Sequence, residues 1–145
     1  MEFVREFDYH ATLKPPVTFG SRMFLEVAEG RATGDRLTGT LLSGGGDWIV
    51  LGADGWGQLD VRGQLVTDDG AFVYMYYTGL LELNEKVMSA IATGAATDWP
   101  DQYFRTTPRF ETGDERYRWL TTSLFVSEGR LMAGGGVEYR VHRVT

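Results

Sequence analysis

The stretch GQLDVRGQLVTDDGAFVYMYYTG, residues 57–79, is the starting point for predicting the fold, because it has the pattern of two β-strands joined by a tight turn. Apolar and polar residues alternate on both sides of Asp69-Gly70, and an Asp-Gly pair between such runs is a strong signal for a β-hairpin. A two-residue turn at this pair predicts that Arg62 lies opposite Tyr77. A three-residue turn would place Arg62 opposite Tyr76 instead.

The two-residue turn gives this hairpin two unlike faces. One face carries Asp60, Arg62 and Tyr77. The other face is too apolar to leave in water and carries Leu59, Val61, Leu65, Phe72, Tyr74 and Tyr76. Either the apolar face lines a barrel interior and Asp60–Arg62 is an ion pair on the solvent side, or the charged face lines a cavity and the apolar face meets a second subunit.

The rest of the chain has the pattern of further short strands. Glycine clusters separate segments rich in Val, Phe, Tyr, Leu and Thr, which is typical of antiparallel β proteins. The N-terminal segment alternates, with Phe7, Tyr9 and Ala11 on one face and charged residues on the other. Further strands are predicted at about 22–29, 36–43, 47–53, 57–68, 71–82, 102–110, 119–127 and 136–144. These strands are enough to close a barrel.

One segment predicts a short helix, at about residues 84–93. Asn84 can cap its N-terminus and Gly94 can end it. Its apolar stripe consists of Val87, Ala90 and Ile91. We expect this helix to cover one end of the barrel. The predicted fold class is therefore all-β, a closed antiparallel β-barrel with one short helix, in a single domain spanning residues 1–145.

Composition restricts the possible functions. The absence of Cys excludes thiol catalysis, disulfides and cysteine-ligated metals. A net charge of -6 opposes binding to a polyphosphate backbone, so nucleic acid is not an expected partner. The N-terminus MEFVREFDYH has charges where a secretory signal needs an apolar core, and no run reaches the ~18 apolar residues of a membrane span. We expect no membrane partner and a cytoplasmic protein.

Asp47 is the first candidate for chemistry, because it follows three glycines and precedes Trp48. A carboxylate that Trp48 desolvates at a pocket mouth can have its pKa raised enough to act as a general acid or base near neutral pH. The alternative is an Asp that closes a turn by accepting hydrogen bonds from backbone amides.

The stretch YFRTTPRFETGDERYRW, residues 103–119, supplies a second set of candidates. Arg105, like Arg62, can bind a carboxylate, enolate or phenolate oxygen and stabilise developing negative charge. Alternatively, Arg105 pairs with Glu111, which is otherwise a second acid or base. The predicted substrate-binding residues are Trp48, Asp60, Tyr74, Tyr76, Tyr103 and Trp119. Core packing alone is an alternative explanation for the aromatic members of this set.

The ordered motifs resemble those of the family called domain of unknown function 3237. They are Gly45-Gly46-Asp47-Trp48, Asp60-Val61-Arg62, Thr67-Asp68-Asp69-Gly70, Tyr77-x-Gly79, Tyr103-Phe104-Arg105, Phe110-Glu111-Thr112-Gly113 and Trp119-Leu120. The resemblance implies a lipocalin-like or allene-oxide-cyclase-like barrel with an internal pocket, often a homodimer, and no settled reaction. Thr121 stands where the family often has Asn, which leaves any role for that amide without a counterpart here.

Two functions are compatible with these features. The first is a cofactor-free enzyme that acts on a small aromatic or polyketide-like molecule by general acid/base catalysis, as an isomerase, cyclase, lyase or hydratase. The second is a ligand-binding barrel without chemistry. His10 and His142 lack further ligands at metal-site spacing, so no metal is predicted. Neither a G-x-S-x-G elbow nor a dinucleotide fingerprint occurs, and we predict no cofactor.

Overall fold

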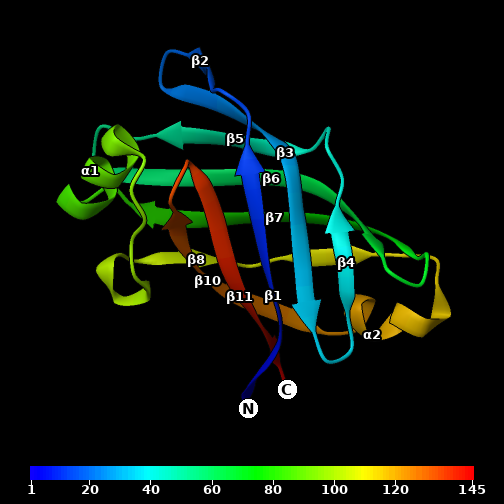
Figure 1. Cartoon of the computed structure of the whole chain (residues 1–145). Helices are drawn as coiled ribbons and strands as arrows, with labels where there is room; N and C mark the ends of the chain where they lie inside the picture. Colours follow the sequence, from blue (N-terminus) through cyan, green and yellow to red (C-terminus); the bar gives the residue numbers. More distant parts are fainter.

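Strand pairing closes the sheet of this protein on itself. The strands are β1 (Phe3–Leu13), β2 (Val17–Phe19), β3 (Arg22–Gly34), β4 (Thr38–Leu41), β5 (Gly46–Leu51), β6 (Trp56–Thr67), β7 (Phe72–Glu82), β8 (Phe104–Thr106), β9 (Arg109–Glu111), β10 (Leu124–Met132) and β11 (Gly136–Val144). In the computed structural model, antiparallel neighbours run β1-β3-β5-β6-β7-β8-β10-β11 and return to β1 (Figure 1). Strands β2, β4 and β9 lie outside this ring. The prediction of a closed antiparallel barrel is confirmed.

The central hairpin has a longer turn than the two-residue turn predicted for it. Val66 pairs with Phe72, and the Thr67 N–H donates to the Ala71 carbonyl at 2.8 Å, which leaves three residues in the loop. Gly70 takes the left-handed conformation with φ 93°, as such loops require. Arg62 therefore lies opposite Tyr76, and its predicted pairing with Tyr77 is wrong.

This one-residue shift exchanges the faces of β7. The interior face of the hairpin consists of Leu59, Val61, Leu65, Val73, Met75 and Tyr77, all buried. Asp60 and Arg62 point outward, together with the partly exposed Tyr74 and Tyr76. The apolar face of β6 is thus interior, as one of the two interpretations held, but the prediction that Tyr74 and Tyr76 share that face is wrong. Side chains alternate in a strand, so a slip of one residue moves a whole set to the other side.

Two other predicted strands are interrupted. The segment predicted at 102–110 divides into β8 and β9 at Thr107-Pro108, because proline has no N–H to give to a ladder. The segment predicted at 119–127 begins instead as a short helix, α2 (Arg118–Thr121), and becomes a strand only at Leu124. A preceding turn of 3-10 helix, Glu115–Tyr117, starts this change of structure.

The predicted helix is present as α1 (Glu85–Thr93). The Val87 N–H donates to the Asn84 side chain at 3.0 Å, and Gly94 ends the helix with φ 72°. Val87 and Ala90 are buried, while Met88 and Ile91 are 50% and 56% exposed. Helix α1 lies at one end of the barrel and α2 lies at the other end (Figure 1). Neither helix has the length and apolar character needed to cross a bilayer.

Aromatic rings fill the end of the barrel that α2 covers. Phe110 packs edge-on against Phe7 at 5.9 Å and against Phe125 at 5.1 Å between ring centroids. Leu120 of α2 is 1% exposed and packs into this cluster. None of these four side chains reaches the hollow space that occupies the half of the barrel toward α1. The barrel is thus packed at one end and hollow at the other.

This division predicts unequal costs for the same substitution at the two ends. Val73→Ala removes two methyl groups from close packing, so we expect a loss of about 2 kcal/mol in the free energy of unfolding. Val61→Ala only enlarges an existing cavity, so about 1 kcal/mol or less is expected. Urea denaturation of both variants measures the difference, and equal losses would contradict a hollow half.

Candidate functional site

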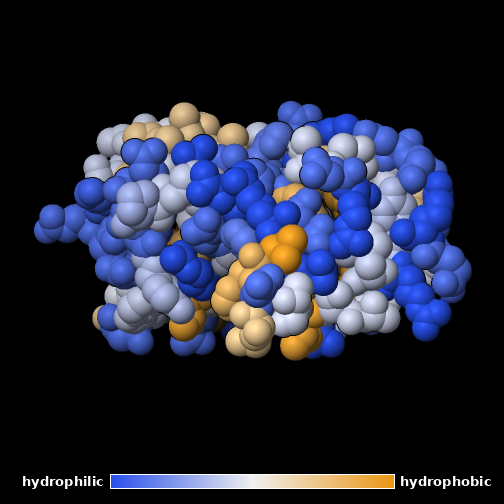
Figure 2. All heavy atoms as spheres, turned by 90° about the horizontal axis from the view of Figure 1, so that it is seen from below, coloured by the Kyte–Doolittle hydropathy of each residue, from blue (hydrophilic) through white to orange (hydrophobic).

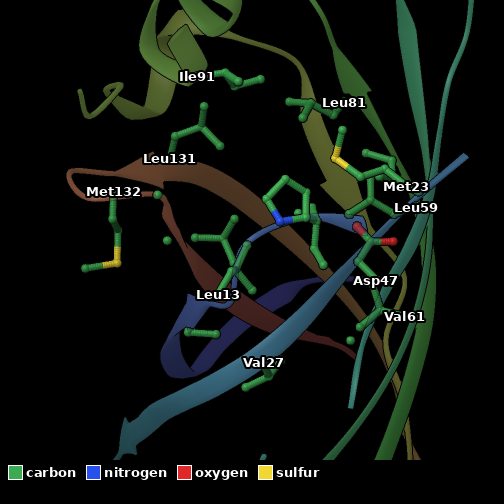
Figure 3. A pocket seen from close by; sticks show the side chains of 18 of the residues that line it. Leu13, Met23, Val27, Asp47, Leu59, Val61, Leu81, Ile91, Leu131 and Met132 are labelled. Carbon is green, nitrogen blue, oxygen red and sulfur yellow. The ribbon is translucent and has the colours of Figure 1, made fainter. Parts of the chain in front are cut away.

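The hollow half of the barrel forms a cavity of about 730 Å³. Of its 36 lining residues, 24 are hydrophobic, so the walls favour an apolar guest. The walls come from the inner faces of the barrel strands, and α1 and the β10–β11 turn contribute to the mouth. Figure 3 shows the carboxyl group of Asp47 beside Met23, Leu59 and Val61, with Leu131 across the space.

Asp47 reaches this cavity because it occupies an inward position of β5. It lies in the ladder between Leu25 of β3 and Val61 of β6. The neighbouring Trp48 points outward and is 40% exposed. Gly46 permits the close approach of β5 to β3, since a Cβ at this position would lie 2.5 Å from the Leu25 carbonyl oxygen.

A single backbone hydrogen bond holds the Asp47 carboxylate. Strands β5 and β6 pair at Asp47–Val61 and again at Val50–Gln58, and between these pairs the Asp60 N–H donates to Asp47 Oδ1 at 3.0 Å. The other oxygen, Oδ2, makes no hydrogen bond within the protein. The side chain thus keeps its orientation while one oxygen is left to meet a ligand.

The surroundings of Asp47 raise its pKa to about 7. Burial is the largest cause, because an apolar cavity disfavours the charged form, and the charge of Asp60 adds to it. The hydrogen bond from the Asp60 N–H opposes both and keeps the rise smaller. Asp47 is therefore present in both protonation states near neutral pH, as a general acid or base must be.

Three tyrosines line the same cavity. Tyr9 and Tyr139 face each other across β1 and β11 with ring centroids 4.9 Å apart, and Tyr77 packs edge-on against Tyr139 at 5.7 Å. Burial raises the pKa of Tyr77 to about 12 and those of Tyr9 and Tyr139 well above their ordinary value. The charge of Asp47 raises all three further, so these hydroxyls stay neutral and act as hydrogen-bond donors.

Arg62, Arg105 and Glu111 do not point into the cavity, contrary to the expectation that they do. Arg62 donates a hydrogen bond to the Tyr74 hydroxyl on the outer surface. Arg105 donates to the Phe104 carbonyl at 3.0 Å, and Glu111 is exposed. Each occupies an outward position of its strand, next to an inward apolar residue, which is Val61, Phe104 or Phe110. The face of the molecule in Figure 2 is largely hydrophilic, in keeping with such charged outer positions.

The predicted substrate-binding side chains also lie outside the cavity. Asp60 is exposed, and Trp48 stacks on Phe24 at 4.1 Å on the outer face. Tyr103 is 47% exposed, and Trp119 lies beneath Arg36 at the packed end. The outward set is Trp48, Asp60, Tyr74, Tyr76 and Tyr103. The aromatic rings in these motifs cover the outside of the barrel or its packed end.

Sequence reasoning missed the roles of Tyr9 and Tyr139. A signal for Tyr9 was present, because it shares the apolar face of its segment with Phe7 and Ala11. Tyr77 was assigned to the charged face by the two-residue turn. Tyr139 lies next to Tyr9 only because β11 pairs with β1. This pairing joins strands from the two ends of the chain, and no local sequence pattern predicts it.

The fold and the cavity define this protein as a closed β-barrel with an internal space of ligand size. The chain belongs to the family described as protein of unknown function (DUF3237), whose model matches residues 2–144. The resemblance found in the sequence motifs is thereby confirmed.

Relatives and solved structures agree with this assignment. A UPF0311 protein from Rhodopseudomonas palustris is 33% identical over 107 residues, which are 74% of this chain and 70% of the relative. A crystal structure of a protein from that organism has a TM-score of 0.91 at 30% identity and covers 99% of this chain and 97% of its own. A "beta-barrel like protein" from Acinetobacter baumannii has a TM-score of 0.84 at 25% identity, covering 99% and 96%.

A more distant structure shares the fold alone. It is described as an enzyme from Penicillium herquei, with a TM-score of 0.68 at 19% identity, covering 99% of this chain and 92% of its own.

The raised pKa of Asp47 predicts a pH dependence of stability. The folded protein keeps this proton up to about pH 7, whereas the unfolded chain releases it at about pH 3.9. The bound proton therefore stabilises the folded state at low pH, and this contribution to the free energy of unfolding is lost as pH rises from about 4 to about 7. Asp47→Asn has no such proton, and its oxygen still accepts from the Asp60 N–H. We expect the stability of this variant relative to wild type to rise with pH across that window and then level off.

Urea denaturation at intervals from pH 4 to pH 8 measures this difference, which we expect to be on the order of 1–3 kcal/mol. Asp35→Asn is the matched control, because Asp35 is exposed and lies outside the cavity. A constant difference between Asp47→Asn and wild type across the range would contradict the raised pKa.

Proposed function

We propose that this protein is a cofactor-free enzyme that moves a proton on a mainly apolar small organic substrate held inside the barrel, with Asp47 as the general acid or base. The observation that carries the proposal is a carboxyl group with a pKa of about 7 inside a cavity of about 730 Å³. A carboxylate on the surface shows the opposite pKa shift, because a hydrogen bond from Arg31 lowers the pKa of Asp68.

In this proposal, the carboxyl group and the hydroxyl groups of the cavity have separate roles. Deprotonated Asp47 takes a proton from a C–H or O–H of the substrate onto Oδ2, the oxygen without a protein partner. The hydroxyls of Tyr77 and Tyr139 then donate hydrogen bonds to the substrate oxygen on which negative charge develops. Asp47 returns the proton to another atom of the substrate or to a leaving group. The apolar walls exclude water and strengthen these interactions.

This proton balance needs neither an oxidant nor a reductant. It suits an isomerase, a cyclase, a lyase or a hydratase that acts beside a carbonyl or phenol. The structure described as an enzyme from Penicillium herquei is compatible with a catalytic barrel, although it shares only the fold with this chain.

A second candidate is a barrel that binds the same kind of molecule without transforming it. The observation in its favour is the lining, in which 24 of 36 residues are hydrophobic and Asp47 is the one carboxylate. In this reading Asp47 and the tyrosines only orient a ligand. The two candidates differ in one measurable respect, the movement of a substrate proton.

Proton exchange in deuterium oxide distinguishes the two candidates. We expect wild-type protein to accelerate the exchange of the acidic C–H protons of 2-tetralone, followed by proton NMR. The rate should rise with pH as Asp47 loses its proton, with a midpoint at about 7, and then level off. Asp47→Asn should lower the acceleration by about 100-fold or more, which is the usual contribution of general acid/base catalysis.

Asp35→Asn, a change of the same charge on the outer surface, should exchange like wild type. Chemical-shift changes of the ketone establish that it binds. A bound ketone without accelerated exchange would support the non-catalytic barrel, and normal acceleration by Asp47→Asn would remove Asp47 from the mechanism.

A further inference from the structure

The polar groups of the cavity lie at one level of the barrel. Along β5, the inward positions are Asp47, Ile49 and then Leu51 at the α1 end, and along β1 they are Tyr9, Ala11 and then Leu13. In both strands the side chains thus become apolar toward the mouth. At the mouth itself, the half-exposed Ile91 of α1 continues this apolar lining. A ligand that fills the cavity therefore places its polar group at the inner level and its apolar body toward the mouth.

The cavity contains no positive charge to pair with an anion. Arg62 borders it through the backbone of β6, but its guanidinium lies on the outer surface with Tyr74. Lys14 lies near the mouth and is already paired with Glu26, where both side chains meet solvent. A carboxylate or phosphate would enter an apolar space without a counter-charge and would meet the negative charge of Asp47.

The hydrogen-bonding groups of the cavity instead suit a neutral oxygen. Tyr9 is 3% exposed, and its buried hydroxyl lies beside that of Tyr77. Tyr77 and Tyr139 add further hydroxyl groups to this cluster. A hydroxyl left without a partner in an apolar cavity costs about 1–3 kcal/mol, so a ligand whose oxygen pairs with one of these groups is favoured over a purely apolar one. Asp47 Oδ2 accepts from a ligand hydroxyl when ionised and donates to a carbonyl when protonated.

We propose that the substrate of this barrel is an uncharged molecule with an apolar body and a hydroxyl or carbonyl oxygen at its inner end, and that the cavity rejects carboxylates. This inference rests on the proposed function only in assigning the ligand to the same cavity and to Asp47. It narrows the substrate class, because a neutral alcohol, phenol or ketone fits and an organic acid does not. It also replaces the expectation that Arg105 or Arg62 holds an anionic group.

A series of three ligands of nearly equal shape tests this inference. We choose 2-naphthylmethanol, 2-naphthoate and 2-naphthylmethylammonium, and measure their dissociation constants by calorimetry at pH 8. We expect the alcohol to bind about tenfold or more tightly than the carboxylate, which corresponds to about 1.4 kcal/mol. Asp47→Asn should reduce this ratio about threefold or more by strengthening carboxylate binding, while alcohol binding stays within about threefold of wild type.

Asp35→Asn is again the matched control and should keep the wild-type ratio. The inference is overturned if the carboxylate binds as tightly as the alcohol, if the ammonium ligand binds most tightly, if none of the three binds, or if Asp47→Asn leaves the ratio unchanged. A circular dichroism melt of Asp47→Asn establishes that the variant is folded.

The binding series and the exchange assay fail independently. A preference for the alcohol without proton exchange contradicts the proposed catalysis and leaves the ligand class intact. Accelerated exchange together with a preference for the carboxylate contradicts the ligand class and leaves the catalysis intact.

Discussion

Closure of the sheet, together with the pleat of its strands, determines which side chains of this protein face the interior. Because the sheet has no open edge at its ring of strands, every second residue must face a confined interior, and the residues between must face solvent. Asp47 is inside and Trp48 is outside for this reason alone. The chemistry available to the cavity is thus set by which member of each neighbouring pair the pleat turns inward.

The interior serves two purposes that occupy separate ends. Toward α2, the rings of Phe7, Phe110 and Phe125 pack closely and stabilise the barrel. Toward α1, the walls remain apolar but do not meet, and a cavity of about 730 Å³ results. A rigid packed end allows the other end to stay hollow, since the ladder of backbone hydrogen bonds continues through both.

The cavity is apolar enough to change the properties of the few polar groups within it. Burial raises the pKa of Asp47 to about 7, and the same burial keeps the hydroxyl of Tyr77 protonated. A single N–H, that of Asp60, moderates the first effect without cancelling it. One acid that exchanges its proton near neutrality therefore stands beside donors that do not, which is the division of roles that proton transfer to and from a neutral substrate requires.

Local patterns predicted the barrel class, the ends of α1 at Asn84 and Gly94, and Asp47 as a candidate acid or base, because alternation, capping and glycine-rich turns are local properties of the chain. Local patterns did not predict which faces turn inward or which side chains meet in the closed barrel. One extra residue in the hairpin turn exchanged the faces of β7, and the pairing of β1 with β11 brought Tyr9 to Tyr139. Register and long-range pairing depend on the closure of the whole sheet, so no short stretch of sequence contains them.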